Sequence, residues 1–101
     1  MTLRKVVDET VHVRCRLGKG LIREEVWQDS TGKVVRYNLA FINPWLSRRD
    51  NGRVLGYDNR HGRHHRHYAG SQQAFRFTSY ERLIAHFLSE VRELREREEP
   101  I

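Results

Sequence analysis

The chain has 101 residues, of which 38% are apolar and 32% are charged, and its formal net charge is +6. This length predicts a single domain over residues 1–101, and the single cysteine, Cys15, excludes an internal disulfide and a zinc site built from several cysteines of one chain. The start of the chain has no apolar run of signal-peptide length, and LAFI at 39–42 is far too short to cross a bilayer. We therefore expect a cytoplasmic protein without membrane contact.

The first half of the sequence predicts β-strands. Apolar and polar side chains alternate over 10–17, which is typical of a half-buried strand. The run 21–28 predicts a second strand, although its spacing also fits a short helix. The strongest strand signal covers 34–43, before Pro44. One face of that strand carries Val35, Tyr37, Leu39 and Phe41.

The middle of the chain predicts shorter strands. Asn51-Gly52 favours a hairpin turn in front of a strand at 53–58. A glycine-bearing loop follows, and HHRHY at 64–68 begins another strand. The aromatic residues of AFRFT predict one more strand at 74–78.

The last quarter has the spacing of an amphipathic helix. Thr78 and Glu81 fit a capping box, in which Thr78 caps the helix and Glu81 reaches back to it. The apolar stripe consists of Leu83, Ile84, Phe87, Leu88, Val91 and Leu94. The sequence thus predicts an α+β fold, in which a mainly antiparallel sheet of about four to six short strands packs one long C-terminal helix on one face.

One stretch, GYDNRHGRHHRHYAG at 56–70, contains four of the six histidines. The surrounding segment, 51–77, holds five arginines and one acidic residue, so the positive charge is most concentrated here. Clustered positive charge favours a polyanionic partner, most simply nucleic acid. The candidate nucleic-acid-binding residues are Arg60, Arg63, Arg66, Tyr68 and His64.

His65 and His67 suggest a chemical function for this stretch. In an extended chain they share one face, while His64 and Arg66 point to the other. Two imidazoles near cations match the needs of a metal-independent ribonuclease, since one takes a proton from the ribose 2′-hydroxyl and the other donates one to the leaving oxygen. We expect no cofactor and no metal for this chemistry.

Two alternatives remain open at this point. His65, His67 and Asp58 together form a possible metal-binding set, although the neighbouring arginines repel a divalent cation. The histidines and arginines also fit a solvated loop, which would bind RNA or protein without cutting it.

The run GYDN, the pair His65-x-His67, Gly70 and the segment FRFTSYERLIAHFLSEV resemble the TumE-type toxins of bacterial toxin–antitoxin modules. This resemblance implies a toxin beside an antitoxin that carries a helix-turn-helix domain, and a functional set of Tyr57, Asp58, Asn59, His65 and His67. Together with the basic segment, it leads us to expect a small toxin directed at RNA or at the translation machinery.

Overall fold

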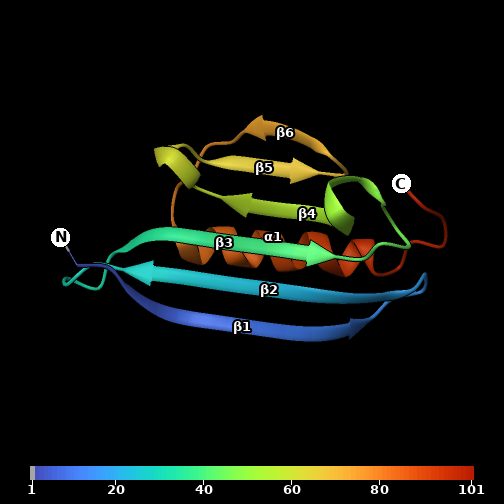
Figure 1. Ribbon diagram of the computed structural model, residues 1–101, viewed down its shortest axis with the longest axis horizontal. Helices are drawn as coiled ribbons and strands as arrows, with labels where there is room; N and C mark the ends of the chain where they lie inside the picture. The colour runs from blue at the N-terminus through green and yellow to red at the C-terminus, as the bar shows by residue number, and fades with distance from the viewer. Residues whose placement is uncertain (1) are drawn as a thin grey trace.

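The computed structural model describes residues 2–101, which form a six-stranded antiparallel sheet with one helix on one face (Figure 1). The strands lie in chain order across the sheet, so each strand pairs with its neighbour in sequence. They are β1 Arg4–Arg14, β2 Lys19–Gln28, β3 Val34–Ile42, β4 Arg53–Asp58, β5 His65–Tyr68 and β6 Ser71–Ala74. The helix is α1 Tyr80–Leu94, and short 3-10 turns, Arg49–Gly52 and Arg60–Gly62, precede β4 and β5. The α+β prediction is confirmed.

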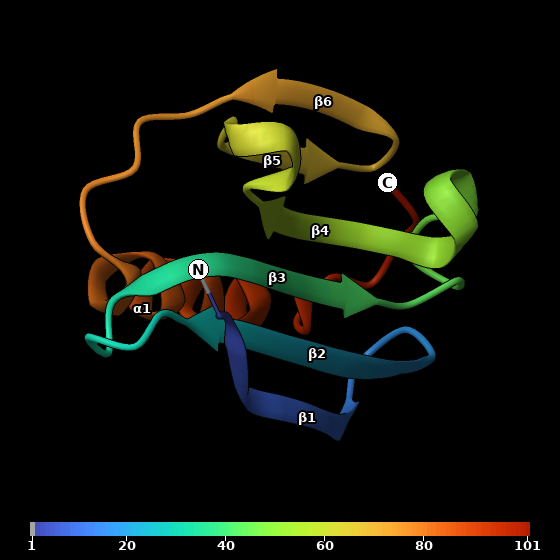
Figure 2. The same ribbon diagram turned by 60° about the vertical axis from the view of Figure 1, so that its left-hand side comes forward.

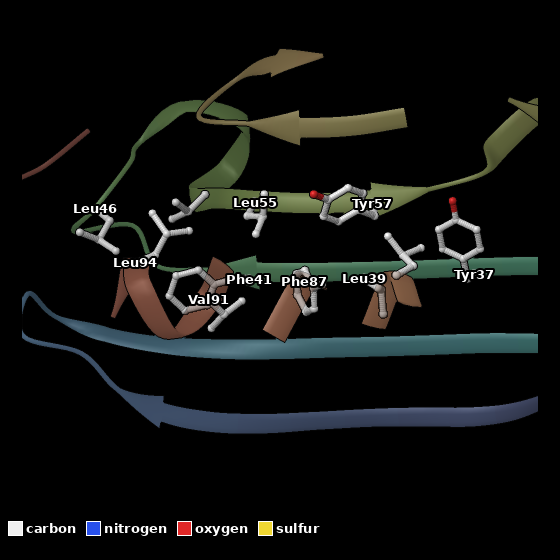
Figure 3. Packing of buried hydrophobic residues seen from close by; sticks show 11 residues of the cluster. Tyr37, Leu39, Phe41, Leu46, Leu55, Tyr57, Phe87, Val91 and Leu94 are labelled. Carbon is white, nitrogen blue, oxygen red and sulfur yellow. The ribbon is translucent and has the colours of Figure 1, made fainter. Parts of the chain in front are cut away.

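The core lies between α1 and the sheet (Figure 3). The stripe predicted for the helix faces this core, except that Leu88 is 42% exposed. The sheet contributes alternate residues of its central strands, as their period-two pattern requires. The buried cluster includes Tyr37, Leu39, Phe41, Leu55, Tyr57, Leu83, Phe87, Val91 and Leu94. The other face of the sheet is left uncovered by any helix of residues 2–101 (Figure 1).

The strand predicted at 74–78 is wrong. The last strand is β6, and the following residues leave the sheet to reach α1 (Figure 2). Phe75 and Phe77 alternate like strand residues because both rings pack inward from this linker. The Phe75 ring lies 5.0 Å from that of Tyr57, and Phe77 stacks on His64 at 4.4 Å.

The predicted helix cap is one residue too early. Ser79 caps α1, because its Oγ accepts a hydrogen bond from the Arg82 backbone amide at 3.2 Å. Thr78 belongs to the extended linker, so the capping box of Thr78 and Glu81 does not form.

The outer strand and one turn also differ from the prediction. β1 begins at Arg4 and ends at Arg14, so residues 15–17 form part of the turn into β2, and Val11 is 50% exposed. Asn51-Gly52 closes a longer connection, 43–52, instead of a two-residue hairpin. No helix within residues 2–101 is long and apolar enough to span a membrane.

The packing of α1 predicts unequal effects of truncating two adjacent residues. Phe87 is fully buried, so Phe87→Ala is expected to lower the free energy of unfolding by about 3–5 kcal/mol. Leu88→Ala, next to it, is the matched control and should change the stability by less than about 1 kcal/mol, because this side chain is exposed. Urea unfolding measures both values, and equal effects would contradict the placement of the helix.

Candidate functional site

The register of β4 and β5 brings Asp58, His65 and His67 together. Asp58 pairs with His65 and Gly56 pairs with His67, and directly paired residues project from the same face of a sheet. This is the open face, opposite α1. The His67 Nε2 atom lies 2.7 Å from Asp58 Oδ2, and His65 Nδ1 lies 3.6 Å from Asp58 Oδ1. One carboxylate therefore contacts two imidazoles whose ring centroids are 6.2 Å apart.

The environment of Asp58 favours the charged carboxylate. Burial raises the pKa of Asp58, but hydrogen bonds from the Arg60 backbone amide and from His67 outweigh it, so the pKa lies below its usual value. Since a carboxylate only accepts hydrogen bonds, His67 donates through Nε2. In the neutral ring, Nδ1 of His67 is then the nitrogen with a free electron pair.

These three side chains line an open groove of about 610 Å³ together with cations from β3, from β4 and from the loop before β5. The cations are Arg36, Arg53 and Arg60. The Arg53 side chain passes close over Gly56. A Cβ atom on that glycine would be only 2.9 Å from Arg53 Cδ. The Arg53 Nε also pairs with Asp50 at 2.6 Å.

The groove contains residues that the sequence analysis missed. The alternation of β3 offers a signal for Arg36, because it lies out of phase with Tyr37 and Leu39, which face α1. No comparable signal exists for Arg53, whose position depends on the irregular register between β3 and β4.

Tyr57 and Arg66 lie on the opposite face of the sheet, under α1. Both donate hydrogen bonds to the carboxylate of Glu90, and Arg66 Nε also donates to the Tyr57 hydroxyl at 3.0 Å. Burial is the main reason why the pKa of Tyr57 is raised to about 12. The Arg66 guanidinium lies 5.2 Å from the ring centre of Tyr68, which packs against the core. The structure therefore does not bring the predicted site residues Tyr57, Arg66 and Tyr68 together with His65 and His67.

His64 also faces α1. Its Nδ1 lies 2.7 Å from the Tyr37 hydroxyl, and burial lowers the pKa of its imidazole. Asn59 ties the end of β4 to β3, since its Oδ1 accepts from the Tyr37 amide and its Nδ2 donates to the Val35 carbonyl. Arg63, in contrast, is exposed on the loop before β5.

A metal site on the open face would need the donor atoms of His65, His67 and Asp58 to converge on one position. Within residues 2–101, no three or more His, Cys, Asp or Glu side chains are arranged to hold a metal. The two imidazoles instead approach the two oxygens of one carboxylate.

A family model described as Toxin TumE matches residues 3–95, nearly the whole chain and all of the residues discussed above. This match confirms the family resemblance read from the sequence. The chain matches no curated protein and no solved structure.

The lowered pKa of Asp58 predicts that the stability of the fold depends on pH. Because its pKa is lowered by folding, its stabilising effect is present above the ordinary aspartate value of 3.8 and is lost as the pH falls through the lower value of the folded state. Asp58→Asn is therefore expected to lower the free energy of unfolding at pH 7 by about 1–3 kcal/mol. Urea unfolding at several pH values should find this difference shrinking below pH 3.8. A difference that is constant with pH would contradict the assignment.

Proposed function

Because the chain belongs to the TumE toxin family, and is thus the toxin of a toxin–antitoxin module with a cognate antitoxin, we propose that it acts by cutting RNA without a metal ion. The group formed by His65, Asp58 and His67 is the observation that carries this proposal. Both imidazoles are partly exposed, with 20% and 13% of their side-chain surfaces accessible, so a phosphate can reach them.

His67 is the general base of the proposed reaction. Its Nδ1 removes the proton from a ribose 2′-hydroxyl, while the bond from Nε2 to Asp58 holds the ring in place. The 2′-oxygen then attacks the adjacent phosphorus. His65, in its protonated form, donates a proton to the 5′-oxygen as the bond from phosphorus to this oxygen breaks. The products are a 2′,3′-cyclic phosphate and a free 5′-hydroxyl.

The positive charge of the groove favours the binding of an anionic substrate. Arg36 and Arg60 line the same groove as the two histidines, where a guanidinium stabilises the charge that develops on the phosphate, whereas Arg53 in this groove is already paired with Asp50. Arg63 adds positive charge on the adjoining loop. The antitoxin that neutralises this toxin is expected to carry a helix-turn-helix domain, in keeping with the family resemblance.

The two histidines predict the outcome of a cleavage assay. Purified protein is incubated with single-stranded RNA in the presence of a chelator, and the fragments should end in 2′,3′-cyclic phosphate. His65→Ala and His67→Ala should each lower the cleavage rate by about 10²–10⁴-fold, the range typical of general acid–base catalysis. The matched control is His12→Ala, which removes an exposed imidazole from β1 and should leave the rate unchanged.

Other outcomes of the cleavage assay, together with growth tests and elemental analysis, would identify the alternatives. Intact RNA with growth inhibition retained would reject the nuclease. Toxicity that survives both histidine substitutions but disappears in Arg60→Glu/Arg63→Glu would indicate a toxin that binds its target without chemistry. A stoichiometric metal in elemental analysis, combined with loss of activity in chelator, would support the metal-binding alternative.

A further inference from the structure

A second hollow, of about 300 Å³, lies on the helix side of the sheet. It is bounded by Tyr57 of β4, by the linker 75–79 and by the first turns of α1. Its lining combines aromatic rings with arginines. The rings are Tyr57, Phe75 and Phe77, and the arginines are Arg66, Arg76 and Arg82. We call this hollow the linker cleft.

The aromatic rings of the linker cleft are packed against neighbouring rings. Phe75 meets the Tyr57 ring edge-on, with centroids 5.0 Å apart. Phe77 stacks on His64 with an angle of 8° between the two planes. Aromatic side chains fixed in this way bind unpaired nucleobases by stacking, independently of sequence.

The arginines of the linker cleft differ in their pairing. Arg66 is matched by Glu90, so its charge is satisfied within the protein. Arg76 and Arg82 are exposed and form no ion pair within residues 2–101. The rim of the cleft therefore carries two guanidinium groups that are free to contact phosphates.

We propose that the linker cleft binds one nucleotide of single-stranded RNA, with the base against Phe75 and Phe77 and the flanking phosphates on Arg76 and Arg82. A volume of about 300 Å³ admits one base but no duplex. An acidic peptide would satisfy the arginines but would leave the aromatic side without a stacking partner, so RNA is the better match. This inference rests on the proposed action on RNA.

The position of the cleft relates it to the groove on the open face. β5 serves both sites, since His65 and His67 line the groove while Arg66 of the same strand lines the linker cleft. Within residues 2–101, the short edge strand β6, with all four residues exposed, is the one strand of the sheet beyond β5 (Figure 2). A flexible strand of RNA passing around this edge contacts both sites.

Fluorescence anisotropy with a labelled ten-nucleotide 2′-O-methyl RNA tests the proposal, because this probe lacks the attacking hydroxyl and binding is measured without cleavage. Arg76→Ala/Arg82→Ala should weaken binding at least about tenfold, since two phosphate contacts are lost. Arg92→Ala/Arg97→Ala is the control with the same change of charge, at exposed positions near the end of α1, and should bind nearly as the wild type does.

A second comparison isolates the base. An abasic strand of the same length should bind the wild type about 5- to 100-fold more weakly than the probe, the range expected for one stacked base or more. Phe75→Ala should reduce this preference and Phe75→Tyr should restore it, with circular dichroism confirming that each variant folds. The abasic comparison needs no variant, so it remains decisive if Phe75→Ala is unstable.

Several outcomes would overturn the assignment. These are no binding of the probe, equal binding by the two double variants, or equal binding of the abasic strand. Unchanged RNA binding combined with loss of neutralisation by the antitoxin would assign the cleft to the protein partner instead. Binding that responds as expected while unmodified RNA stays intact would retain the cleft and reject the nuclease. If unmodified RNA is cleaved but Arg76→Ala/Arg82→Ala leaves binding unchanged, the nuclease would be retained and the cleft rejected.

Discussion

The packing of α1 against a single face of the sheet is the constraint on which the rest of the structure depends. Phe87 and Val91 bury the helix against the central strands, and the alternation of β4 and β5 then sends neighbouring residues to opposite sides. Tyr57 lies under the helix, where its hydroxyl donates a hydrogen bond to Glu90. Asp58, the next residue, therefore projects from the open face on the other side of the sheet. The candidate site is thus oriented by a helix that lies on the far side of the sheet from it.

The run GYDN shows how closely structural and chemical roles are interleaved. Gly56 leaves room for Arg53 on the open face, and Tyr57 joins the sheet to α1. Asp58 contacts the two imidazoles, whereas Asn59 fastens the end of β4 to β3. Four consecutive residues therefore play four different parts, and within this run it is the Asp58 side chain that contacts the imidazoles of His65 and His67. A motif of this kind identifies a family without separating the residues that react from those that position them.

Periodicity along the sequence predicted the strands and faces that depend on neighbouring residues alone. The alternation over 34–43 predicted β3 closely, the short run 53–58 after a turn signal predicted β4, and the spacing of His65 and His67 predicted their common face. The aromatic alternation at 74–78 has the same period as a strand, but the residues after Ala74 leave the sheet toward α1 while both rings pack against the core. Arg53 was missed for a similar reason, because its position follows from long-range register between strands.

The distribution of unpaired charge also limits the kind of RNA that this toxin accepts under our proposal. Arg66 belongs to the basic segment by sequence, but Glu90 neutralises it beneath the helix. The exposed arginines that line the two hollows are Arg36 and Arg60 on the open face and Arg76 and Arg82 at the linker cleft. A rigid duplex lies against one face of a sheet at a time, whereas an unpaired strand turns sharply and exposes its bases for stacking. An RNA that engages both sets of arginines must therefore be single-stranded where it passes the edge of β6.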